Sequence, residues 1–184
     1  MERLTMKNKT TDWIQTFSGK QVWPLEPDME SLCIEDIAHA LSQQCRFAGH
    51  TRKFYSVAEH SVRATYLMPV GLELWGLLHD ASEAYLVDVP RPLKHSPGMA
   101  FYREAEQRLQ SMLYAKWGLT GAAPHELAEV DDQLLLTEQR DLLGPQVALW
   151  MVKAQPLDNR IVPWTSEKAE QMFLGTFEGL RGLP

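Results

Sequence analysis

The stretch that decides the fold of this chain is Trp75-Gly-Leu-Leu-His79-Asp80-Ala-Ser-Glu83-Ala-Tyr85, where a histidine and an aspartate stand side by side in an apolar helical run. A buried carboxylate without a partner is costly, so Asp80 needs a cation, a hydrogen-bond network or exposure at a helix end. One divalent ion would satisfy both side chains, which makes the pair a candidate metal site. The alternative is a helix C-terminal turn in which His79 bonds a carbonyl and Asp80 meets water.

Two further candidate ligands come from other expected helices. His60 recurs with apolar residues at helical intervals, so it points inward; the alternative is a buried histidine bonded to a carbonyl. Asp131 lies near the apolar stripe of a helix expected over 124–143, whereas Asp132 is turned about 100° away. We therefore predict that three helices bring His60, His79, Asp80 and Asp131 to one ion, with Asp132 as the alternative to Asp131.

This ordered ligand set resembles the signature of the HD-domain metal-dependent phosphohydrolases. Three flanking motifs resemble, in their order and residues, motifs of the small HD nucleotidases, which include bacterial 5'-deoxynucleotidases and phage dATP triphosphohydrolases. These motifs are Ser56-Val-Ala-Glu-His60-Ser, His79-Asp-Ala-Ser-Glu83 and Asp88-Val-Pro-Arg-Pro-Leu-Lys94. The resemblance covers residues 30–145 well, while the first 20 and the last 30 residues contribute little. It implies a compact helical bundle and hydrolysis of a nucleotide phosphate.

Two acidic residues are candidates for catalysis. Glu83 follows Asp80 by one helical turn, which makes it our candidate general base; the alternative is an exposed carboxylate on a helix surface. In the resembled nucleotidases, the aspartate that matches Asp88 lies near the sugar and the attacking water. Asp88 is therefore a second catalytic candidate, and its alternative is an Asx turn before Pro90.

Four residues are candidates for binding substrate. Arg46 and Lys94 correspond by position to residues that contact phosphate in the resembled enzymes, where a cation neutralises developing charge. Arg91 is a further basic candidate. Phe47 stands where related enzymes often place tryptophan, so it is a candidate for stacking on a base, although we expect it in the core instead.

Two imidazoles and two carboxylates leave coordination positions open around one divalent transition metal. Mn, Co, Fe, Ni or Zn suits this mixed set, whereas magnesium and calcium prefer oxygen ligands. Such an ion polarises a phosphoryl oxygen and activates water, so hydrolysis needs no serine or cysteine nucleophile. We expect a deoxynucleotide phosphohydrolase, either a 5'-nucleotidase acting on monophosphates or a triphosphohydrolase, with a preference for adenine as a further hypothesis. The alternatives are a hydrolase of a signalling nucleotide, such as an alarmone or a cyclic dinucleotide, and a catalytically silent nucleotide sensor.

Length, charge and apolar content indicate the number of domains, the class of partner and the compartment of the protein. A chain of 184 residues predicts one domain, 1–184, and a net charge of -6 argues against binding a nucleic-acid backbone. The chain has no run of 18 apolar residues and no apolar segment after the basic residues 1–9, so we expect a cytoplasmic protein that does not insert into a membrane. Cys33 and Cys45 are expected to be reduced thiols.

Helical periodicity and the positions of proline and glycine predict an all-α bundle of about six or seven helices and no strand. The expected helices cover residues 31–44, 55–68, 72–85, 100–117, 124–143 and 165–180, with a loop over 88–98 and a short helix or an interface over 146–153. Residues 19–27 are expected to cover the core. Trp13, Phe17 and Trp23 are candidates for packing across a subunit boundary, which predicts a homo-oligomer.

Overall fold

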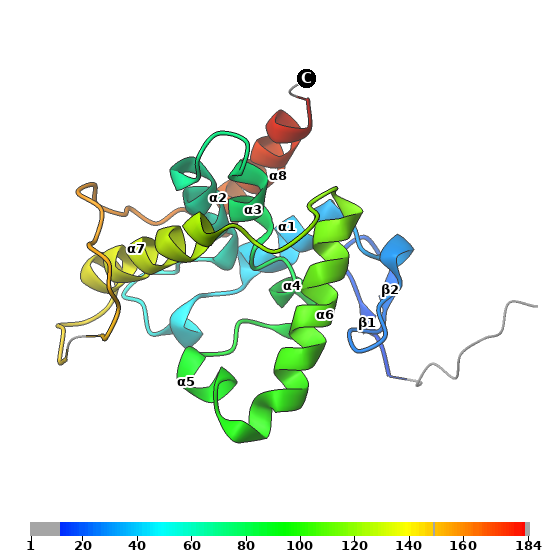
Figure 1. Ribbon diagram of the computed structural model, residues 1–184, viewed down its shortest axis with the longest axis horizontal. Helices are drawn as coiled ribbons and strands as arrows, with labels where there is room; N and C mark the ends of the chain where they lie inside the picture. Colours follow the sequence, from blue (N-terminus) through cyan, green and yellow to red (C-terminus); the bar gives the residue numbers. More distant parts are fainter. Residues whose placement is uncertain (1–11, 149, 183–184) are drawn as a thin grey trace, which may run out of the picture.

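The computed structural model describes residues 12–148 and 150–182, so the expectation for residues 1–9 lies outside the described residues (Figure 1). The predicted all-α class is confirmed. The six longer helices are α1 (Ile34–Gln43), α2 (Val57–Leu67), α3 (Glu73–Leu78), α6 (Ala100–Lys116), α7 (His125–Leu142) and α8 (Ser166–Gly182). Two single-turn helices, α4 (Glu83–Leu86) and α5 (Arg91–Lys94), lie between α3 and α6, and three 3-10 turns cover Met29–Ser31, Phe47–Gly49 and Pro97–Met99.

Helix α2 lies at the centre of the molecule and packs against α1, α3, α7 and α8. Its N-terminus is capped by Ser56, whose side chain accepts a hydrogen bond from the backbone N–H of Glu59. Eight of its eleven residues are buried, which is why the polar residues among them need partners inside the protein. Gly76 allows α3 to approach α2 closely, because a Cβ there would lie 2.7 Å from Met68 Cγ and 3.0 Å from the Thr65 backbone.

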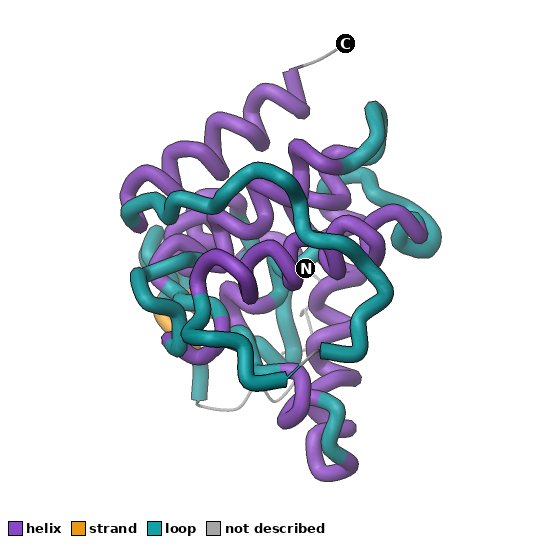
Figure 2. Tube along the Cα trace, turned by 90° about the vertical axis from the view of Figure 1, so that its left-hand side faces the viewer, coloured by secondary structure: helices purple, strands orange, loops and turns teal. Residues whose placement is uncertain are grey.

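The prediction of no strand is wrong, because residues 14–22 form a small hairpin. Strands β1 (Ile14–Gln15) and β2 (Gln21–Val22) pair antiparallel, with Ile14 opposite Val22. Figure 2 shows that this sheet occupies one small edge of a molecule that is otherwise helices and loops. A pair of two-residue strands is too short for alternation to be recognised in the sequence. Val22 is fully buried, which agrees with the expectation that residues 19–27 cover the core.

Three other expectations need correction. Residues 72–85 are not one helix, because the chain forms turns between α3 and α4. The expected loop over 88–98 contains the turn of α5, since proline at the first positions of a helix needs no N–H partner. For residues 146–153 the helix alternative is wrong, because none of the described residues there is helical; the interface alternative stays a prediction, and Val147 and Met151 are almost fully exposed.

The N-terminal aromatic residues do not all lie in the core. Phe17 stacks on His39 of α1 with ring centroids 3.8 Å apart, yet it remains 63% exposed. Trp13 is also exposed. Packing of these side chains across a subunit boundary stays a prediction, which light scattering coupled to size-exclusion chromatography would test. Within the described residues, no helix combines the length and the apolar composition that crossing a bilayer requires.

Candidate metal centre

The two histidines face each other where α2 meets the end of α3. His60 and His79 bring their Nε2 atoms to 3.1 Å of one another. His60 is fully buried, and only 9% of the His79 side chain is exposed. His79 Nδ1–H donates to the carbonyl of Gly76 at 2.8 Å, so the lone pair of its neutral ring is on Nε2. Nδ1 of His60 is held in turn by a carboxylate, Glu138, at 2.6 Å.

Two carboxylates converge on the same point. Asp131 Oδ1 lies 3.3 Å from His60 Nε2, and Asp80 Oδ2 lies 3.1 Å from His79 Nε2 and 3.7 Å from His60 Nε2. His60, His79 and Asp131 each offer a ligand atom, and these three atoms lie within 4.8 Å of one another. The structure therefore brings all four predicted ligands together, and the three-residue set could hold a metal ion.

A cation fits this donor set because the facing atoms are all electron-rich. With both Nδ1 atoms bonded, the Nε2 lone pairs of neutral His60 and His79 point at each other and at two carboxylates, and only a proton or a metal ion relieves that repulsion. Burial raises the pKa of Asp131, but a hydrogen bond from protonated His60 and the positive charges of His60, His79 and Arg46 together outweigh burial and lower the pKa to about 2. Imidazole and carboxylate together suit a divalent transition metal.

We expect the affinity of the metal-free protein for Mn²⁺ to rise with pH up to about 9. Burial lowers the pKa of His79, but Asp80 and the other acceptors around the ring outweigh it and raise the pKa from 6.5 to about 9. A proton on Nε2 competes with the ion, so affinity should fall about tenfold for each pH unit below that pKa. Calorimetric titration across this range would measure the slope, and a flat profile would rule out His79 as a ligand.

The break between α3 and α4 is held open by Gln110 of α6. In a continuous helix, the Ser82 N–H would bond to the carbonyl of Leu78. Instead, the Ser82 N–H donates to Gln110 Oε1 at 3.0 Å, and Gln110 Nε2 donates to the Leu78 carbonyl at 2.6 Å. A side-chain amide thus inserts into the helical ladder, which explains why the predicted helix is interrupted at His79 and Asp80.

Glu83 is buried beside the cluster rather than exposed on a helix surface. It is 5% exposed, and its Oε2 atom is buried with no hydrogen-bond partner among the described residues. Burial and the carboxylates of Asp80 and Asp88 hold the pKa of Glu83 well above its usual value. Lys94 Nζ lies 3.4 Å from the other oxygen, Oε1. An unsatisfied buried carboxylate oxygen is the kind of group that active sites retain.

Asp88 is held near Glu83 by Gln44, which bridges the turn between them. Gln44 Nε2 donates to the Glu83 carbonyl at 3.0 Å, and the Asp88 N–H donates to Gln44 Oε1 at 3.2 Å. Burial and Asp80 raise the pKa of Asp88, against the lowering effect of Arg46. Val87, between the two acids, has φ 72° and ψ 146°, a conformation that β-branched residues rarely adopt.

Replacing Val87 with glycine is expected to raise the free energy of unfolding by about 1 kcal/mol, because glycine adopts this conformation without strain and the lost side chain is 59% exposed. Urea denaturation would measure the change. Val70→Gly is the matched control, since Val70 is 96% exposed and has no positive φ. The control should lose stability, and a loss of similar size at Val87 would mean that its backbone is not strained.

Arg46, the candidate phosphate ligand, lies beside the cluster and is paired with its carboxylates. Its side chain is 11% exposed and bonds to Glu138 at 3.1–3.2 Å, with a longer contact of 3.5 Å from Nη1 to Asp80 Oδ2. The expectation that Phe47 lies in the core is wrong. Phe47 is half-buried with φ 55°, lies under the Arg46 guanidinium and stacks on Trp150, with ring centroids 6.1 Å apart. The backbone reversal at Phe47 turns its ring away from the core.

Of the two candidate cations near α5, the structure brings one to the site. Lys94 Nζ lies 2.7 Å from Glu106 Oε1 and 3.4 Å from Glu83 Oε1. Arg91 is exposed at the start of α5. Lys94 pairs with Glu83 and Glu106, but Arg91 forms no ion pair with either acid in the described part of the chain. The structure therefore does not place Arg91 in the cluster.

No model of a known protein family matches the chain. The chain is 35% identical to the uncharacterized protein YfdR of Escherichia coli over 175 residues, which cover 93% of this chain and 97% of YfdR. This chain belongs to the YfdR family. It is also 36% identical to the uncharacterized protein RCAP_rcc00048 of Rhodobacter capsulatus over 121 residues, which cover 61% of each protein.

In this member of the YfdR family, the cluster includes Glu138, a residue that is not among the candidates predicted from the sequence. Glu138 is fully buried on α7 and touches His60, Arg46 and Tyr55. A signal for it exists in the sequence, because Glu138 follows Asp131 by seven residues, or two helical turns on the same face.

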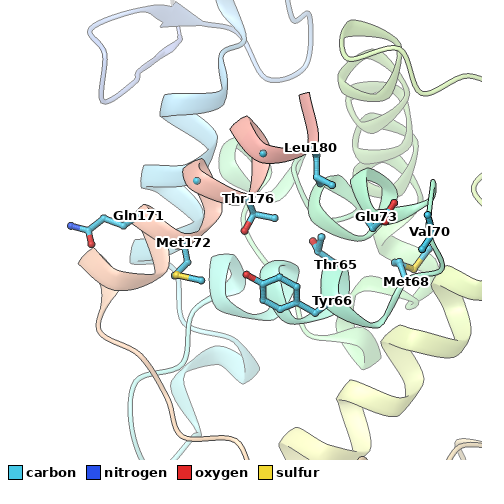
Figure 3. A pocket seen from close by; sticks show the side chains of 11 residues that line it. Thr65, Tyr66, Met68, Val70, Glu73, Gln171, Met172, Thr176 and Leu180 are labelled. Carbon is cyan, nitrogen blue, oxygen red and sulfur yellow. The ribbon is translucent and has the colours of Figure 1, made fainter. Parts of the chain in front are cut away.

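This YfdR-family protein also has a groove whose lining residues are separate from the His60, His79 and Asp131 cluster. Its volume is about 560 Å³, and it lies between α8 and the α2–α3 region (Figure 3). Tyr66, Met68 and Val70 line one side, and Met172, Thr176 and Leu180 line the other. Among the described residues that line the groove, Glu73 is the only charged one. A mainly apolar groove with one carboxylate does not suit a phosphate. The charged cluster at His60 and Asp131 is therefore the better candidate for nucleotide chemistry.

Proposed function

We propose that this protein is an HD-superfamily, metal-dependent phosphohydrolase acting on deoxynucleotides, as a 5'-nucleotidase for monophosphates or as a triphosphohydrolase. The observation that carries the proposal is the convergence of His60, His79, Asp80 and Asp131 beside the unbonded buried oxygen of Glu83. The motif resemblance supports the substrate class. We place this activity in the cytoplasm, where deoxynucleotides are made and used.

In this proposal, His60, His79, Asp80 and Asp131 hold one divalent transition metal. When bound, such an ion supplies Lewis-acid polarisation of a phosphoryl oxygen and makes water a better nucleophile. The side chain of His60 is fully buried and those of His79 and Asp80 are 9% and 20% exposed, whereas that of Asp131 is 43% exposed. This difference leaves one side of the cluster open to solvent and to a phosphate group.

The residues around the cluster divide the remaining tasks. Glu83 Oε2 accepts the proton of the attacking water, because it is a buried carboxylate oxygen beside the cluster with no hydrogen-bond partner among the described residues. Arg46 and Lys94 offset the charge that develops on phosphate oxygens. Both cations are held by carboxylates, so their positions are set before substrate binds. We assign Asp88, which Gln44 links to Glu83, to a hydrogen bond with a sugar hydroxyl.

The experiment that tests this function is a product analysis with metal-stripped protein. Each deoxynucleoside mono-, di- and triphosphate is incubated with Mn²⁺, Co²⁺ or Mg²⁺, and the products are separated by chromatography. Nucleoside with phosphate from monophosphates establishes a 5'-nucleotidase, and nucleoside with triphosphate establishes a triphosphohydrolase. Tight nucleotide binding without turnover would favour the silent sensor. Turnover of an alarmone or a cyclic dinucleotide alone would favour the signalling hydrolase.

A further inference from the structure

Glu138 connects the metal cluster to the arginine beside it. The carboxylate is fully buried on α7, and each of its oxygens has a separate task. Oε1 accepts hydrogen bonds from His60 Nδ1 at 2.6 Å and from the Tyr55 hydroxyl at 2.9 Å. Oε2 accepts from Arg46 Nε at 3.2 Å and lies 3.1 Å from Arg46 Nη2. One buried carboxylate therefore fixes both a metal ligand and a candidate phosphate ligand.

We propose that Glu138 is a positioning residue that sets metal affinity and anion affinity together, an inference that rests on the proposed function of this site. Through Oε1 it orients the His60 ring, so that Nε2 points at His79 and Asp131. Through Oε2 it aims Arg46, whose remaining Nη1 atom faces Asp80 at 3.5 Å. Removing the charge of Glu138 loosens both side chains at once.

The physical basis is the way in which a carboxylate acts on a metal-ligating histidine. A carboxylate that accepts from Nδ1–H fixes the tautomer, restricts ring rotation and makes Nε2 a stronger donor. Losing such a partner commonly reduces metal affinity about 10-fold to 100-fold. Arg46 adds a second consequence, because a guanidinium that loses its buried partner has no fixed orientation toward an incoming anion.

A second buried carboxylate provides a matched control. Glu59 is also fully buried and adjoins His60 in sequence, but it points toward the other side of α2. Glu59 Oε1 accepts from Arg63 at 2.7–2.9 Å, and Oε2 accepts from the Trp164 backbone N–H at 2.8 Å. It ties the start of α8 to α2 and has no hydrogen bond to the metal cluster among the described residues. Glu59 therefore has the burial and the ion pair of Glu138 without its proposed role.

The test compares Glu138→Gln with Glu59→Gln in the full chain. Calorimetry of metal-stripped protein with Mn²⁺, and of Mn²⁺-loaded protein with sulfate as a tetrahedral dianion, measures both affinities. Thermal unfolding followed by circular dichroism reports folding. We expect Glu138→Gln to reduce Mn²⁺ affinity about 10-fold to 100-fold and sulfate affinity in parallel. Glu59→Gln should unfold at a lower temperature and keep both affinities near those of the wild type.

Two more variants keep the test decisive if Glu138→Gln does not fold. Tyr55→Phe removes one hydrogen bond to Oε1 but keeps the charge, so it should reduce Mn²⁺ affinity by only a few-fold. Glu138→Asp keeps the charge, so it should retain Mn²⁺ affinity within about 10-fold of the wild type. A folded Glu138→Gln protein with wild-type Mn²⁺ affinity overturns the inference and leaves the proposed function standing. A wild-type protein that binds no divalent metal overturns both.

Discussion

Asp131→Ala is expected to reduce Mn²⁺ affinity at least about 100-fold and to abolish turnover with it. Asp131 Oδ1 is one of three ligand atoms that lie within 4.8 Å of one another, and it is 3.3 Å from His60 Nε2. Losing an outer partner of a metal ligand already costs up to about 100-fold, so losing a ligand itself should cost more. Calorimetric titration of metal-stripped protein measures the change. Because the side chain is 43% exposed, the fold should hardly be affected.

The neighbouring aspartate is the control for this prediction. Asp132→Ala removes the same charge one position along α7, on a side chain turned about 100° away. It should leave both Mn²⁺ affinity and turnover near the wild-type values. Helical periodicity favours Asp131 over Asp132 as the ligand. If Asp132→Ala lost the metal and Asp131→Ala kept it, that assignment would be wrong.

Glu83→Gln is expected to keep metal affinity and to lower the rate of hydrolysis by about 10² to 10⁴. The change preserves side-chain size, so it leaves no cavity at a residue that is 5% exposed. An amide cannot accept the proton of the attacking water, and the unbonded Oε2 atom would no longer be a base. Steady-state kinetics with whichever deoxynucleotide the wild type hydrolyses, together with Mn²⁺ titration, separate a lost base from a lost ligand.

A contribution from Lys94 must be separated from that of Glu83. Glu106→Gln weakens the shorter Lys94 contact, at 2.7 Å, without touching the 3.4 Å contact between Lys94 and Glu83. If the rate loss in Glu83→Gln arose from a displaced lysine, Glu106→Gln should lose at least as much. We expect it to raise KM instead, with a much smaller effect on kcat. Full activity in Glu83→Gln would exclude Glu83 as the general base.

Several features of the fold were predictable because they depend on local periodicity. Helices α1, α2, α6, α7 and α8 lie within a few residues of their predicted ranges, since an apolar stripe of period 3.6 marks each of them. The same periodicity placed His60 and Asp131 on inward faces, which is why the ligand set was recognisable before the structure. Glu83 could not be placed in this way, because a residue one turn after Asp80 is equally compatible with exposure.

The sequence by itself determined helices α1, α2, α6, α7 and α8 and the inward faces of His60 and Asp131, since both follow from spacing along one segment. Only the tertiary structure decided how the site is completed. Gln110 opens the helix at His79 across 28 residues of chain, and Glu138 reaches His60 across 78 and Arg46 across 92. Such partners are set by which helices pack together, and a hydrogen bond between distant residues leaves no periodic trace in the sequence.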